Sequence, residues 1–172
     1  MELPIKKVVE ETNRLKLNAP EWYYKVLNNA PELIDKIANG VGSETSWTYH
    51  LTPDTIWGLN INPTSHAHDY MYSIPYKFKS VAQGLAWKRL ADHYFDINCR
   101  IQIKDYAGWL ESWRYDRVDK YNIALNIGGS EAFWINKELP KDYDKYYSTS
   151  PINDVKIIQM YKDILAQIIT MG

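Results

Sequence analysis

The chain has 172 residues, a formal net charge of −1, seven Trp, fourteen Tyr and a single cysteine. This length suits one domain with a core of its own, and the aromatic content argues against disorder. The near-neutral charge gives no basic face for nucleic acid, which we do not expect as a partner, and a lone cysteine, Cys99, excludes an intrachain disulfide.

The N-terminal part of the chain predicts helices that prolines separate. Residues 1–18 mix acidic and basic side chains with few apolar ones, so we expect no signal peptide, no transmembrane segment and a cytoplasmic protein. Apolar positions recur at helical spacing over residues 5–17. A second helix is expected to open at Pro20, and a third to run from Pro31 to Gly40, since proline suits a helix start and glycine a helix end.

The polar stretch that follows could hold a short β-hairpin, with one strand at residues 46–51 and a return strand at residues 55–59. A helix should then begin near Pro63. Asn62 is a good N-terminal cap, and proline suits the first helical position because its missing N–H has no partner there. The helix should end by Pro75, because the residue before a proline disfavours helical geometry.

This helix carries the adjacent pair His68 and Asp69. Neighbouring side chains on a helix point about 100° apart, so we expect the two not to hydrogen-bond easily and to have separate roles. The division that fits their chemistry is a base at His68 and a cation ligand at Asp69. The alternative is a surface His and Asp on an ordinary helix, and the dipeptide leaves both open.

The next helix is predicted over residues 80–98. Taken at steps of three and four, one face carries Val81, Leu85, Lys88, Asp92, Phe95 and Cys99. Asp92 should therefore be partly buried, and a buried carboxylate is costly without a partner. His68 is the expected partner if the two helices form an antiparallel pair. Alternatively, Asp92 pairs with Lys88 or Arg89 on its own helix, or faces water.

The rest of the chain predicts two more helices. Residues 101–103 could be extended, Asp105 would cap a long helix, and Gly128 and Gly129 would close it. A Tyr-rich linker is expected at residues 141–150. Residues 151–171 form an amphipathic pattern that predicts a last helix packing on the same domain.

With these residues in place, the chain resembles the bacterial and fungal branch of the secreted phospholipase A2 superfamily, and a phage-borne domain family of unknown function. The match covers roughly residues 46–129. It rests on Pro53-Asp54, Gly58, the His68-Asp69-Tyr70-x-Tyr72 helix, Asp92 followed by an aromatic and a cysteine, and the run from Tyr121 to Gly128. The resemblance implies a mainly α fold with an antiparallel helix pair, in a single helical domain at residues 1–140.

The resemblance also implies roles for three residues. His68 would be the general base that takes a proton from water, and Asp92 would accept the other imidazole N–H. Asp69 would be a calcium ligand, and the ion would polarise the ester carbonyl of a lipid or another ester. One departure is that this chain has Trp47 where the enzymes place a loop Asp.

Three functions stay open at this point. The first is a phospholipase A2-like, calcium-dependent ester hydrolase. The second is a non-enzymatic phage-encoded structural or accessory protein that keeps the scaffold and binds a protein partner or a phage particle. The third is an HD-type metallophosphohydrolase, suggested by His50, the His68-Asp69 pair and a later Asp, which would hold a transition metal.

Overall fold

The computed structural model describes residues 3–40, 55–135 and 137–149. The elements in chain order are α1 (Ile5–Leu15), α2 (Glu21–Asn29), α3 (Pro31–Gly40), β1 (Thr55–Ile56), β2 (Leu59–Asn60), α4 (Asn62–Ser73), α5 (Val81–Tyr106), α6 (Glu111–Trp134) and α7 (Tyr143–Thr149). The predicted mainly α fold is confirmed.

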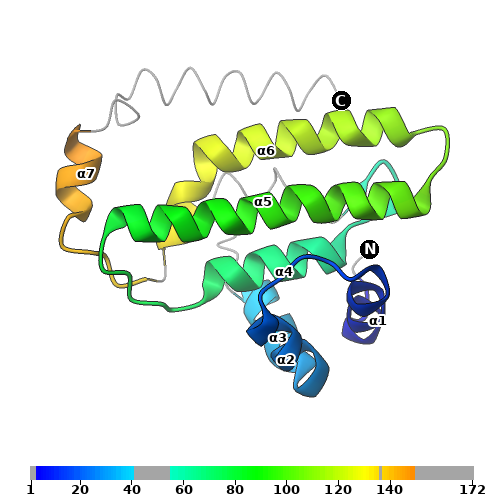
Figure 1. The fold of residues 1–172 in the computed structure, drawn as a ribbon, viewed down its shortest axis with the longest axis horizontal. Helices are drawn as coiled ribbons and strands as arrows, with labels where there is room; N and C mark the ends of the chain where they lie inside the picture. Colours follow the sequence, from blue (N-terminus) through cyan, green and yellow to red (C-terminus); the bar gives the residue numbers. More distant parts are fainter. Residues whose placement is uncertain (1–2, 41–54, 136, 150–172) are drawn as a thin grey trace.

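Helix α5 runs antiparallel to α4, and α6 runs antiparallel to α5 (Figure 1). The N-terminal helices α1, α2 and α3 lie on the side of α4 that faces away from α5. The predicted antiparallel pair is therefore α4 and α5. Because α4 is enclosed between α5 and the N-terminal helices, its side chains are buried almost all round. A helix in this position has no solvent-facing stripe, so its polar side chains need partners from its neighbours.

Three apolar clusters form the core. One joins the β-hairpin to α5 and α6, and it contains Ile56, Leu59, Ile61, Phe95, Cys99, Ile103, Val118, Tyr121 and Leu125. A second lies where the end of α4 meets the start of α5 and the end of α6, and a third joins α2 and α3 to α4. Helices α4 and α5 therefore have packed apolar side chains at both of their ends.

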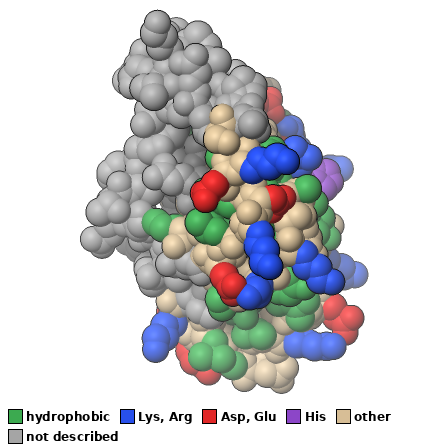
Figure 2. Space-filling view, turned by 90° about the vertical axis from the view of Figure 1, so that its left-hand side faces the viewer, with side chains coloured by type: hydrophobic (Ala, Val, Ile, Leu, Met, Phe, Trp, Pro, Cys, Tyr) green, Lys and Arg blue, Asp and Glu red, His purple; other side chains and the backbone are tan. Residues whose placement is uncertain are grey.

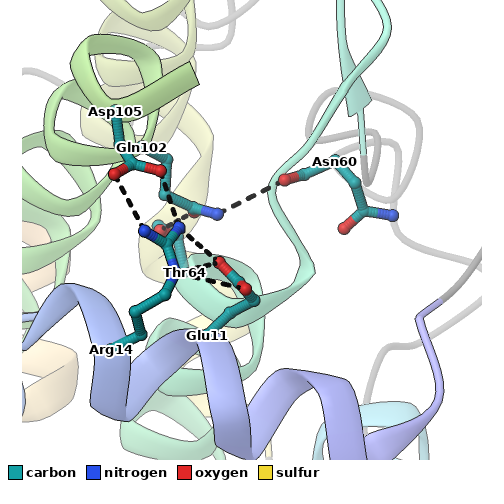
Figure 3. Close-up of polar contacts among 6 residues, drawn as sticks. All are labelled: Glu11, Arg14, Asn60, Thr64, Gln102 and Asp105. Atoms are coloured by element: carbon teal, nitrogen blue, oxygen red, sulfur yellow. Dashed lines mark hydrogen bonds and ion pairs between the residues drawn. The ribbon is translucent and has the colours of Figure 1, made fainter.

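Polar contacts fix the position of α1 and of the segment that leads into α4 (Figure 3). The guanidinium of Arg14 on α1 donates to the carboxylate of Asp105 near the end of α5, at 2.9 and 2.6 Å. The buried hydroxyl of Thr64 on α4 donates to Gln102 on α5 at 2.5 Å, and the Gln102 amide donates to the carbonyl of Asn60 at 3.3 Å. Asp105 therefore tethers α1. The sequence had suggested that it caps the next helix, and it does not.

The β-hairpin differs from the predicted one. Residues 55–59 are not one return strand, because Thr55 pairs with Asn60 and Ile56 with Leu59 across a tight turn. Both turn residues, Trp57 and Gly58, have positive φ, at 46° and 75°. This left-handed pair matches the twist of antiparallel strands, so two residues suffice for the reversal. The other predicted strand, at residues 46–51, lies outside the described residues.

The start of α4 agrees with the prediction to within one residue. Ile61 is the residue before the helix, and Pro63 lies in the first turn. Asn62 is already helical and is not the cap, because its side-chain oxygen accepts a hydrogen bond from the Leu3 backbone N–H at 3.0 Å. The helix ends at Ser73, ahead of Pro75 as predicted.

Helix α5 is longer than predicted, and α6 both begins and ends later than predicted, at Glu111 and Trp134. Residues 101–103 are helical, since Gln102 and Ile103 continue the buried face of α5. That helix ends where Ala107 and Gly108 adopt φ of 53° and 105°. The glycines at 128 and 129 do not close α6, which continues to Trp134 because Phe133 and Trp134 are buried in the second cluster.

The Tyr-rich segment is not a linker, because part of it forms α7. The rings of Tyr143 and Tyr147 lie 4.5 Å apart, one helical turn from each other, and Tyr143 packs edge-on against Trp134 at 5.6 Å. This contact with α6 gives the short helix an apolar face. The predicted helix at residues 151–171 lies outside the described residues. Among the helices of the described ranges, none is both long enough and apolar enough to cross a bilayer.

Candidate functional site

The packing of α4 on α5 brings His68 and Asp92 together. The Nε2 atom of His68 lies 3.1 Å from Oδ1 of Asp92, and both side chains are largely buried. The imidazole is held between the ring of Tyr72, at 4.2 Å, and that of Phe95, at 5.2 Å. The predicted burial of Asp92 and its pairing with His68 are confirmed. We call these two residues the dyad.

Asp92 has two further partners. The hydroxyl of Tyr72, one turn after His68, donates to Oδ1, and the ammonium of Lys88 donates to Oδ2 at 2.7 Å. Lys88 also donates to the backbone carbonyl of Leu125 on α6, at 2.9 Å. Of the partners that the sequence offered for Asp92, which were His68, Lys88 and Arg89, the structure pairs it with both His68 and Lys88.

Gly129 on α6 makes room for these contacts. A Cβ atom at this position would lie 3.0 Å from the Tyr72 hydroxyl and 3.2 Å from both Cε and Nζ of Lys88. These distances are tighter than ordinary van der Waals contact. Gly129 thus serves close helix packing next to the dyad, where the sequence had suggested a helix end.

His68 and Asp69 also interact, which contradicts the expectation that adjacent helical residues would not. Nδ1 of His68 lies 3.2 Å from Oδ1 of Asp69. The divergence of about 100° applies to the Cα–Cβ bonds, and the atoms beyond Cβ can turn back toward each other. The Asp69 side chain is 48% exposed, so the Nδ1 edge of the imidazole is the edge nearer to solvent.

The charges of this cluster follow from its contacts. Carboxylates only accept hydrogen bonds, so an imidazole between two of them carries a proton on each nitrogen. Burial lowers the pKa of His68, but the hydrogen bonds to Asp69 and Asp92 outweigh it and raise the pKa to about 9. Burial tends to raise the pKa of Asp92, but His68 and Lys88 hold it below its usual value. His68 is therefore an imidazolium at neutral pH, and Asp92 is ionised.

The described part of the site does not fit calcium by itself. Calcium takes several oxygen ligands, whereas the described residues contain no group of three or more His, Cys, Asp or Glu that could hold an ion. Asp69 is present, but its carboxylate is bonded to His68. Trp47, His50 and the rest of the predicted calcium loop lie outside the described residues.

Lys137 is a buried residue that the sequence analysis missed. Its ammonium donates to the carbonyl of Tyr72 near the end of α4 and to that of Phe133 near the end of α6, the latter at 2.6 Å. Burial lowers its pKa to about 8. A cation at two helix C-termini satisfies free carbonyls and interacts well with both helix dipoles. Lys137 thus joins the C-terminal ends of α6 and of α4, the helix that carries His68.

No protein-family model, curated protein or solved structure matches this chain. The resemblance to the phospholipase A2 superfamily therefore rests on the quoted residues.

Proposed function

We propose that the protein is an ester hydrolase of the phospholipase A2 type, with His68 as general base. The observation that carries the proposal is the buried contact of 3.1 Å between Nε2 of His68 and Asp92. A buried carboxylate on one nitrogen fixes the proton there, so the other nitrogen is the one that can take a proton from water.

The environment of Asp92 supports this role. Lys88 and Tyr72 both donate to its carboxylate and hold it in one position. An orienting carboxylate must stay ionised throughout a proton transfer at the imidazole, and the low pKa of Asp92 meets that requirement. Lys88 and Tyr72 thus stabilise the negative charge of Asp92, and that charge stabilises the imidazolium of His68.

The Nδ1 edge would be the reactive one. At rest it is bonded to Asp69, and the proton on it must leave before His68 can act as a base. The Asp69 side chain is half exposed and can rotate into solvent. Its departure removes one of the two carboxylates that raise the pKa of His68, which favours the neutral imidazole.

The step that follows is proton transfer coupled to addition. Neutral Nδ1 takes a proton from a water molecule, and the water oxygen bonds to the ester carbonyl carbon. The tetrahedral intermediate then expels the alkoxide, which takes the proton from Nδ1 and leaves as an alcohol beside the carboxylic acid product. Asp92 keeps its negative charge throughout, and no covalent intermediate with the protein forms.

Calcium remains part of the proposal as a prediction from the resemblance. Isothermal calorimetry with calcium on the wild type and on Asp69→Asn tests it. Saturable binding that is lost in Asp69→Asn would support the metal site. Lack of binding at millimolar calcium, the weak end of known sites, would remove calcium from the proposal.

A second candidate is the non-enzymatic structural or accessory protein. It is favoured by one observation, that both imidazole nitrogens are already bonded to carboxylates. In this account the cluster stabilises the helix packing and does no chemistry. The HD-type alternative requires a transition metal, and its first His, His50, lies outside the described residues.

Replacing His68 distinguishes the first two functions. The assay is hydrolysis of a short-chain nitrophenyl ester and of a phospholipid, with folding checked by circular dichroism. We expect His68→Gln to lose about 10²–10⁴-fold in rate, the usual size of general-base catalysis. His93→Gln is the matched control, because His93 is an exposed histidine on α5, next to Asp92 in the sequence. Equal rates in both variants would exclude His68 as the base, and a wild type that does not hydrolyse either ester would favour the non-enzymatic function.

A further inference from the structure

Four exposed aromatic side chains gather at the junction of two chain reversals. Trp57 lies in the β1–β2 turn, and Tyr106, Trp109 and Trp113 lie at or beside the α5–α6 connection. Their exposed fractions run from 40% at Trp57 to 89% at Trp109. We call these four residues the aromatic tip.

Arg114 joins the two reversals. Its guanidinium is buried and donates to the carbonyl of Trp57 and to that of Ala107, each at 3.1 Å. It also lies 4.6 Å from the centre of the Tyr106 ring, and the rings of Trp57 and Trp113 meet edge-on at 5.7 Å. Trp57, Tyr106 and Trp113 are therefore held in place before any binding, and these three side chains have little freedom left to lose.

The fold accounts for the backbone of this surface but not for its side chains. The two-residue turn calls for a left-handed φ at position 57, and a bulky Trp is unfavourable at that φ, which is 46° here. Trp109 contributes almost no buried area, so it adds little to the hydrophobic stabilisation of the domain. A large exposed aromatic group of this kind usually marks a site of interaction.

The tip is poor in charge and lies at one end of the molecule. Glu111 is the only acidic or basic residue between Tyr106 and Trp113, and the nearby Asp105 is bonded to Arg14. The α5–α6 connection is the right-hand extremity of the long axis in Figure 1. The opposite end, seen in Figure 2, instead shows basic and acidic side chains spread among apolar ones. The tip is thus an uncharged, protruding aromatic surface.

We propose that the aromatic tip docks the protein on the surface of a zwitterionic lipid bilayer. Trp and Tyr prefer the headgroup region, where one part of the ring system is in an apolar environment and the N–H or O–H stays hydrated. The tip has no cluster of cations, so its charge matches a neutral headgroup layer and gives no attraction to anionic lipid. A protruding tip suits insertion into a soft interface.

Binding to phosphatidylcholine vesicles, measured by co-sedimentation, tests the proposal. We expect the wild type to bind, Trp109→Ala to bind at least about tenfold more weakly, and Trp109→Ala/Trp113→Ala more weakly still. The matched control is Tyr76→Ala, which removes a ring that is 54% exposed from the α4–α5 connection at the other end and should bind as the wild type does. Trp109 makes few contacts, so its removal should leave folding intact.

Several results would overturn the proposal. These are no binding to phosphatidylcholine, equal binding by Trp109→Ala, or binding that requires anionic lipid and disappears in salt. A concentration-dependent dimer that Trp109→Ala dissociates would assign the tip to contact between copies of the chain and would also overturn it. The inference is independent of the hydrolase, since His68→Gln should bind vesicles as the wild type does.

Discussion

Replacing Asp92 by Asn should destabilise the protein strongly, because it removes a charge that two buried cations share. His68, Tyr72 and Lys88 all bond to this carboxylate, and the neutral Asn amide offers a single oxygen acceptor in its place. Removing one partner of a buried ion pair costs about 3–5 kcal/mol. We expect the lower end of that range, since the Asn amide oxygen still accepts one hydrogen bond. For a chain of this size, 3 kcal/mol lowers the melting temperature by about 6–12 °C.

Urea unfolding followed by circular dichroism at pH 7 measures this cost. In a cycle with Lys88→Met, the double variant should be more stable than the sum of the single costs predicts, by about 1–3 kcal/mol, because the unpaired charge is gone. Asp119→Asn is the matched control. The Asp119 side chain is 61% exposed, so its ion pair with Arg100 should contribute about 1 kcal/mol or less to stability. A cost for Asp92→Asn no larger than this control, or full additivity in the cycle, would refute the reasoning.

Three further predictions concern pH and close packing. The pKa of His68 is raised from 6.5 to about 9, so its contribution to stability is fully present below pH 6.5 and is lost as the pH rises through 9. The wild type should lose more stability over this range than His68→Gln does in urea titrations, and parallel curves would contradict the assignment. Gly84→Ala should destabilise by about 1–3 kcal/mol in thermal melts, because its Cβ would lie 2.2 Å from the buried Trp134 ring, and a more stable variant would show that the ring can move. Gly129→Ala should cost less than Gly84→Ala. Both glycines are helical, but the nearest neighbour of a Cβ at position 129, the Tyr72 hydroxyl, is 3.0 Å away instead of 2.2 Å, and the reverse order would count against this packing.

The dyad could be predicted because its two residues follow helical periodicity. Asp92 interrupts an apolar stripe, and a carboxylate in such a stripe needs a partner from a neighbouring helix. The start of α4 was also predictable, because Pro63 acts on the local backbone. Predictions of this kind need no knowledge of distant contacts.

The errors arose where tertiary packing overrides a local preference. Gly129 looked like a helix end, but α6 continues past it to the buried Phe133 and Trp134, and the glycine leaves room for Lys88 and Tyr72. Tyr143 looked like part of a linker, but it packs on Trp134 and belongs to a helix. In each case the partner lies far away in the sequence, so no local pattern indicates it.

Side-chain rotation explains the remaining difference at the site. Helical geometry sets the directions of the Cα–Cβ bonds of His68 and Asp69, but not those of the atoms beyond them. The contact between the two side chains, and the ammonium of Lys137 on two helix ends, depend on these later torsions and on the neighbouring backbone. Periodicity identifies the buried faces and leaves such contacts undetermined.

The pH dependence of ester hydrolysis tests the central claim that His68 acts as a base oriented by Asp92. The rate of the wild type should rise with pH as the imidazolium, with its pKa of about 9, loses its proton. Asp92→Asn should be slower and should reach its plateau at lower pH, because a carboxylate that raises this pKa is gone. A rate that does not change with pH, or a profile that is the same in Asp92→Asn, would contradict the claim.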